Sequence, residues 1–107
     1  MPDSSGYNAV QGVAREQCPE WLGVIRACHD AIEKQVAAGN VEHTCPAWIK
    51  GHTGLQVRSL RPLVAWGVLE RKRWGVVDGQ NLDASGRAYY LMPDRPGVAR
   101  ALAKLGA

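Results

Sequence analysis

The centre of the chain places four hydrogen-bonding side chains within six residues, and their types are those that recognise the edges of nucleic-acid bases. They are Gln56, Arg58, Ser59 and Arg61. An Arg guanidinium can donate two hydrogen bonds to one guanine, and a Gln amide can pair in the same two-point manner with adenine. The residue types and their spacing therefore favour recognition of base edges as the chemistry of this segment.

Five further basic residues have the chemistry to neutralise phosphates. One precedes the central segment and the others follow it: Lys50, Arg71, Lys72, Arg73 and Arg87. Side chains alternate along a strand, so only some of residues 71–73 can face one side. A solvated basic face that keeps the protein soluble would have the same composition, and it is the structural alternative to phosphate contact.

The net charge of +3 is spread unevenly along the chain. Residues 1–48 carry three basic and six acidic side chains, whereas residues 49–75 carry six basic side chains against Glu70 alone. The positive charge therefore coincides with the candidate contact residues. Such asymmetry bears on partners, and it favours a polyanion such as nucleic acid.

Chain length and cysteine content limit the class of protein. A length of 107 residues fits one domain with one modest core. No apolar run approaches the roughly 20 residues that span a bilayer, and the first residues do not resemble a secretory signal. Three cysteines, Cys18, Cys28 and Cys45, are an odd number in no familiar disulfide framework. We therefore expect a cytoplasmic protein with no membrane partner.

Two helices are predicted ahead of the candidate contact residues. Apolar residues from Trp21 to Val36 recur at spacings of three and four, which predicts a helix with one apolar stripe over about residues 19–38. A shorter helix is predicted over about residues 45–53, where Pro46 suits the first turn.

The first 16 residues are small and polar, with few apolar anchors. They predict a flexible N-terminal tail, or a short leading helix, before a domain over residues 17–107. The chain shows no internal repeat and no second domain.

The candidate contact residues are predicted to lie on a third helix over about residues 56–66. Its buried stripe would comprise Val57, Leu60, Leu63 and Val64. Pro62 removes a backbone donor and costs about 3 kcal/mol in a helix interior. We therefore expect a helix that bends at Pro62, or two short turns of which Pro62 opens the second.

A β-hairpin and a last helix complete the predicted elements. Residues 68–74 and 87–92 have the pattern of two strands, and the segment between them contains two turn signals with glycine. Pro93 ends the second strand, and Asp94 can cap a short C-terminal helix.

The order helix, helix, turn, helix, hairpin, helix resembles the winged helix-turn-helix superfamily of bacterial and archaeal transcription regulators. Three segments carry the resemblance: Ile49-Lys50-Gly51-His52-Thr53-Gly54-Leu55, Leu60-Arg61-Pro62-Leu63-Val64-Ala65-Trp66-Gly67-Val68-Leu69-Glu70, and Gly86-Arg87-Ala88-Tyr89-Tyr90-Leu91. It covers about residues 19–105. The resemblance implies an α+β, mostly α fold, with a three-helix core, a two-stranded β-hairpin wing and a short C-terminal helix.

The resemblance further implies double-stranded DNA binding by a small transcription regulator. The helix at 56–66 would enter the major groove, and the hairpin at 69–91 would lie on the flanking backbone as a wing. The implied contact residues are Lys50, Gln56, Arg58, Ser59, Arg61, Arg71, Lys72, Arg73 and Arg87. Because so small a chain gains specificity through symmetry, we expect a homodimer.

Two other functions stay open on the sequence alone. Only eleven residues separate Leu55 from Gly67, and so short a recognition helix favours a winged helix used as a protein-interaction or assembly module. A metal- or redox-responsive repressor could use Cys28, His29, His43, Cys45 and His52, although no Cys-x-x-Cys motif is present. No catalytic constellation or phosphate-binding loop is visible, so we expect neither an enzyme nor a cofactor.

Overall fold

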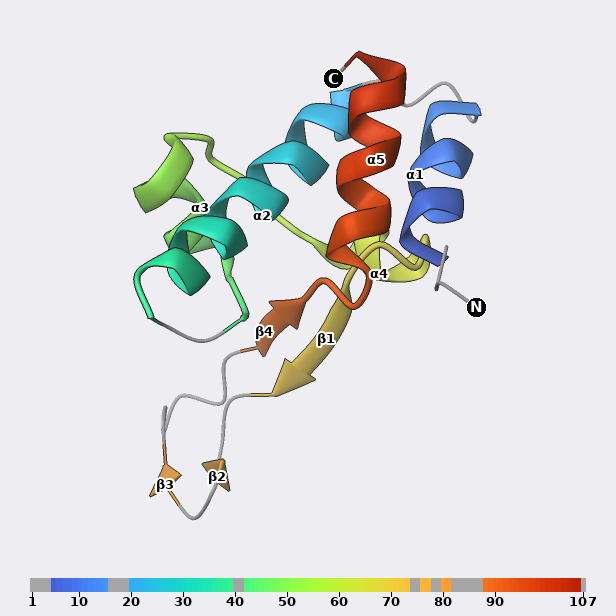
Figure 1. The fold of residues 1–107 in the computed structure, drawn as a ribbon. Coiled ribbons are helices and arrows are strands. Elements are labelled where there is room, and N and C mark those ends of the chain that lie inside the picture. The colour runs from blue at the N-terminus through green and yellow to red at the C-terminus, as the bar shows by residue number, and fades with distance from the viewer. Residues whose placement is uncertain are drawn as a thin grey trace.

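Within residues 5–15, 20–39, 42–73, 76–77, 80–81 and 88–106, which the computed structural model describes, the chain forms a mostly helical α+β fold (Figure 1). The helices are α1 (Ser5–Arg15), α2 (Glu20–Ala37), α3 (Pro46–Thr53), α4 (Arg61–Ala65) and α5 (Arg95–Leu105). The strands are β1 (Glu70–Arg73), β2 (Val76–Val77), β3 (Gln80–Asn81) and β4 (Ala88–Leu91). None of these described helices is long and apolar enough to cross a membrane.

Helix α2 forms the centre of the core, as the apolar stripe predicts. It spans Glu20–Ala37, and its Ile25, Cys28 and Ile32 side chains are fully buried. Complete burial of an aliphatic side chain contributes roughly 1.5–3 kcal/mol, so this stripe is a major source of stability. The stripe ends at the half-buried Trp21 and Val36, which pack against the same core.

Helix α3 spans Pro46–Thr53, also as predicted, and ends sharply at Gly54. The φ angle of Gly54 is 78°, in the left-handed region that favours glycine, and its N–H donates to the Lys50 carbonyl (2.8 Å). The Lys34 ammonium on α2 donates to the carbonyl of His52 (2.9 Å). The end of α3, where the next segment departs, is therefore fixed against α2.

The predicted third helix is wrong over most of its length. Only Arg61–Ala65 form helix α4, and residues 54–60 form an irregular connection. Pro62 lies in the first turn of α4, where a backbone N–H has no helical partner. The Ser59 hydroxyl accepts a hydrogen bond from the Arg61 N–H (3.2 Å), a local bond that competes with helix continuation. Of the two forms expected at Pro62, the short turn that it opens is the one observed.

The predicted hairpin is confirmed. Strands β1 and β4 are antiparallel, with Glu70 opposite Leu91 and Arg73 opposite Ala88, and β2 pairs with β3 in the same manner. The Thr44 backbone exchanges two hydrogen bonds with Tyr90, each 2.9 Å long. This bridge fastens β4 to the segment that precedes α3.

The N-terminal segment is a helix rather than a flexible tail. Helix α1 runs beside α5 (Figure 1), and its Val10 and Val13 side chains are buried in the common core. The ring of Tyr7 lies 6.0 Å from the Arg100 guanidinium and 5.7 Å from the Lys104 ammonium of α5. Of the two forms that the composition left open, a flexible tail or a short leading helix, residues 5–15 adopt the helix.

Asp94 joins α1 to α5 through two hydrogen bonds. Its buried carboxylate caps α5, as predicted, by accepting from the Gly97 N–H (3.1 Å), and it also accepts from the Gly6 N–H (2.9 Å). A Cβ atom added at Gly6 would lie only 2.7 Å from the Asp94 carbonyl oxygen. The close approach of the two helices therefore requires glycine at position 6.

The first prediction compares two glycines of α1. We expect Gly6→Ala to lower the free energy of unfolding by about 1–3 kcal/mol, because the new methyl group overlaps Asp94 and Val98. Gly12→Ala is the matched control, since nothing lies within 4 Å of its added Cβ atom. It is expected to be neutral or to stabilise by up to about 1 kcal/mol. Urea unfolding monitored by circular dichroism measures both values, and equal effects would contradict this packing.

The second prediction concerns the Asp94 carboxylate. Asp94→Ala is expected to lower the free energy of unfolding by about 2–4 kcal/mol, because it removes a helix cap and leaves the Gly6 N–H without its acceptor. Asp94→Asn keeps one side-chain oxygen and is expected to cost less. Urea unfolding of both variants is the measurement, and a neutral Asp94→Ala variant would show that the junction contributes little.

Candidate nucleic-acid interface

Four of the predicted contact residues surround one groove. The groove has a volume of about 490 Å³ and lies between the first turns of α2 and the segment that leads into α4. Its polar lining residues are Gln56, Arg58, Ser59 and Arg61, and its apolar ones are Trp21, Val24, Val57 and Pro62. The structure therefore gathers the donors of the central segment on one surface, although most of them do not lie on a helix.

The irregular segment presents these donors because a few apolar anchors hold it. Leu60 is fully buried and Val57 is half-buried against the core, while Arg58 and Ser59 between them are exposed. The Ser59 hydroxyl then sets the start of α4, where Arg61 is also exposed. Alternation of anchored and exposed residues thus produces the outward face that the predicted helix was expected to provide.

The two arginines of the groove have no acidic partner among the described residues. The ion pairs that the described residues form all involve other basic side chains. Both Arg58 and Arg61 are exposed. A guanidinium has five N–H donors in a planar fork that fits a phosphate, a carboxylate or a guanine edge. Both side chains therefore keep their donors available for an external anion or base.

Two residues of the groove belong to α2, and of these only Trp21 was predicted to lie on the apolar stripe. Trp21 and Val24 lie in the first turns of α2 and are only half-buried. The Trp21 ring packs edge-to-face on Trp66, with ring centres 5.6 Å apart and an angle of 80° between the planes. The position of Trp21 at the end of the apolar stripe was the available signal that one part of this side chain would stay accessible.

The hairpin carries a second, separate group of predicted contact residues. The Lys72 ammonium pairs with the Glu70 carboxylate (2.7 Å), and this contact raises the pKa of Lys72 above its usual value. Arg71 is exposed and forms no ion pair with any described residue. Arg87 lies outside the described residues, and so does the side chain of Arg73.

Lys50 completes the predicted set. It is exposed in the last turn of α3, and it has no acidic partner in the described part of the chain. Neither Lys50 nor the hairpin residues line the groove. The predicted contact residues therefore divide between the groove, α3 and the hairpin.

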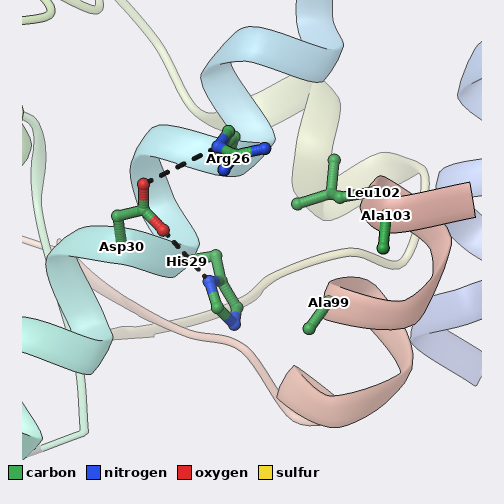
Figure 2. Close-up of a pocket in the computed structure, with 6 residues that line it drawn as sticks. All are labelled: Arg26, His29, Asp30, Ala99, Leu102 and Ala103. Carbon is green, nitrogen blue, oxygen red and sulfur yellow. Dashed lines mark hydrogen bonds and ion pairs between the residues drawn. The ribbon is translucent and has the colours of Figure 1, made fainter. Parts of the chain in front are cut away.

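A smaller cavity lies between α2 and α5 (Figure 2). Its volume is about 190 Å³, and its polar lining residues are Arg26, His29 and Asp30. The Asp30 carboxylate lies 3.9 Å from the Arg26 Nε atom and 3.3 Å from the His29 Nδ1 atom. All three side chains lie on α2 and pair with one another along that helix, so the site offers less to an external ligand than the groove does.

The residues expected for a metal- or redox-responsive protein do not converge. Among the described residues no group of three or more His, Cys, Asp or Glu side chains is placed to hold a metal ion. Cys28 is buried in the core, and Cys45 precedes α3 with a half-buried side chain. The ring of His43 lies between those of Trp48 (5.1 Å) and Tyr89 (4.5 Å), and its burial lowers its pKa.

Comparisons with known protein families, with curated proteins and with solved structures find no match to this chain. Function is therefore inferred from the chemistry of the groove and of the hairpin. Both surfaces carry exposed guanidinium groups and hydrogen-bond donors. The groove also has accessible apolar surface.

The third prediction tests the state of the Cys28 thiol. Burial raises its pKa to about 12, and the reactive form of a cysteine is the thiolate. We expect iodoacetamide to label Cys28 at least about tenfold more slowly in the folded protein than after unfolding in urea. Peptide mass spectrometry after timed labelling measures both rates, with Cys45 as an internal comparison. Rapid labelling of Cys28 in the folded protein would contradict its place in the core.

Proposed function

We propose that this protein binds double-stranded DNA as a small transcription regulator of the winged helix-turn-helix type. The observation that carries the proposal is the gathering of Gln56, Arg58, Ser59 and Arg61 around one exposed groove. Neither arginine has an acidic partner among the described residues. These are the side-chain types that pair with guanine, adenine and phosphate.

The short α4 changes how such a surface would read DNA. A helix of five residues is too short to lie along a major groove, so the donors of residues 56–61 would reach base edges from an irregular segment. Arg61 and the segment before it would enter the major groove of the DNA. Lys50 at the end of α3 would contact a phosphate of the DNA backbone. Long, flexible side chains make this reach possible.

The hairpin would act as the wing. The Thr44–Tyr90 bridge fixes its base, so its cations are held in a defined position relative to α3. Lys72 would have to exchange Glu70 for a phosphate, whereas Arg71 has no such partner to give up. We therefore assign Arg71 a larger share of the backbone contact than Lys72.

The proposal carries two further expectations. A DNA-binding regulator of this size gains specificity from a two-fold symmetric operator, so we propose a homodimer. Its place of action is the compartment that holds the DNA, which in a bacterial or archaeal cell is the cytoplasm.

A protein-interaction module is the second candidate function. The observation that favours it is the apolar part of the groove, where Trp21, Val24 and Val57 are only half-buried. Neutralisation of phosphates does not use such surface, whereas recognition of a protein segment does. The two functions differ in their dependence on salt, because counterion release is specific to the polyanion.

The fourth prediction is that the protein binds a mixed-sequence DNA duplex of about 25 base pairs, with an affinity that falls steeply as salt rises. Replacing both groove arginines, Arg58→Gln with Arg61→Gln, is expected to weaken binding about 10- to 100-fold, because two charge-assisted contacts are lost. The slope of log affinity against log salt should fall by up to about two. Fluorescence anisotropy of a labelled duplex at several salt concentrations measures both quantities.

The matched control also removes two positive charges, but from a part of the surface outside the groove. Arg15 on α1 and Arg100 on α5 are exposed, and neither lines the groove. The variant Arg15→Gln with Arg100→Gln should bind the duplex within about threefold of the unsubstituted protein. Absence of binding by folded protein at low salt would overturn the proposal, and so would an equal loss in both double variants.

A further inference from the structure

The groove beside α4 exposes more apolar surface than contact with a phosphate backbone requires. Trp21, Val24 and Val57 are all half-buried along its walls, and Pro62 contributes a fourth apolar side. Apolar surface that stays in contact with water is unfavourable, and a concave patch of it commonly marks a binding site. This part of the groove is not explained by DNA binding alone.

The size of the groove suits a small organic molecule. Its volume of about 490 Å³ falls within the range of roughly 300–1,000 Å³ that is typical of small-molecule sites. One aromatic wall, Trp21, is held in place by the edge-to-face contact with Trp66 at 5.6 Å. A planar ring system can gain both apolar burial and stacking energy against such a wall.

The positive charge of the groove favours a molecule whose polar group is an anion. Arg58 and Arg61 both line it, both are exposed, and no carboxylate of the described residues pairs with either. A guanidinium binds a carboxylate through two parallel hydrogen bonds. The lining contains no acidic side chain that would repel an anion.

We propose that the groove binds a small planar aromatic carboxylate, with the ring system against Trp21 and Val57 and the carboxylate on Arg58 and Arg61. In addition, and resting on the proposed function, such a ligand competes with DNA, because both would use the same two guanidinium groups. The protein would then be released from its operator when the ligand is present.

The fifth prediction uses naphthoate, a naphthalene ring with one carboxylate, as the probe, and the uncharged naphthalenemethanol as its control. In isothermal titration calorimetry we expect naphthoate to bind with a Kd below about 1 mM, and the alcohol to bind at least about fivefold more weakly. Arg58→Gln with Arg61→Gln should lose the preference for the carboxylate. The charge-matched Arg15→Gln with Arg100→Gln should keep it, because these side chains do not line the groove.

Three outcomes of the calorimetry decide the ligand site. Binding of naphthoate that depends on the two groove arginines supports it. No binding by folded protein overturns it. Binding that is equally strong for the alcohol, or equally strong in the groove variant, also overturns it, because the anion would then have no role.

The anisotropy assay separates the ligand site from the proposed function. Duplex binding measured without naphthoate tests the proposed function alone, and its failure leaves the calorimetric result standing. Where the duplex binds, naphthoate at ten times its own Kd should raise the apparent Kd of the duplex about tenfold. An unchanged duplex affinity under that condition would overturn the competition.

Discussion

The position of Pro62 is the constraint on which the shape of the candidate surface depends. A proline is tolerated in the first turn of a helix but not in its interior, so Pro62 disfavours a continuous helix from residue 56; α4 begins at Arg61, and the residues before it take an irregular path. The Ser59 hydroxyl supports the same break by accepting from the Arg61 N–H. The groove beside α2 is lined by this irregular segment and by the start of α4.

The rest of the fold holds residues 56–61 and the hairpin in place. Buried residues of α2 form the centre of the core, and α5 packs against α2 and α1 through a junction that Asp94 completes with Gly6 and Gly97. The hairpin is attached through the Thr44–Tyr90 bridge and through the buried Tyr90 side chain, which belongs to the same core. Charge is also distributed unevenly, because six of the ten acidic side chains lie in residues 1–48, whereas Arg58, Arg61 and Arg71 are exposed and have no acidic partner among the described residues.

Regular periodicity made most of the elements predictable. The stripe of α2, the first turn of α3 at Pro46, the strand pair and the Asp94 cap were each evident from residue type and spacing. The helix at 56–66 was predicted wrongly, because Leu60 and Leu63 are buried at helical spacing although the backbone before residue 61 is not helical. The groove itself could not be predicted, since it depends on Trp21 meeting a segment that lies about 35 residues away in the sequence.

The central claim is that residues 56–61 and the hairpin form the surface that contacts DNA. Its most direct test is to follow the backbone amide resonances of the isotope-labelled protein by NMR while a duplex is added at low salt. We predict that the largest changes fall on residues 55–61 and on β1, and that α1 and the exposed side of α5 change little. Changes confined to α1 and α5, or no changes at all, would contradict the claim.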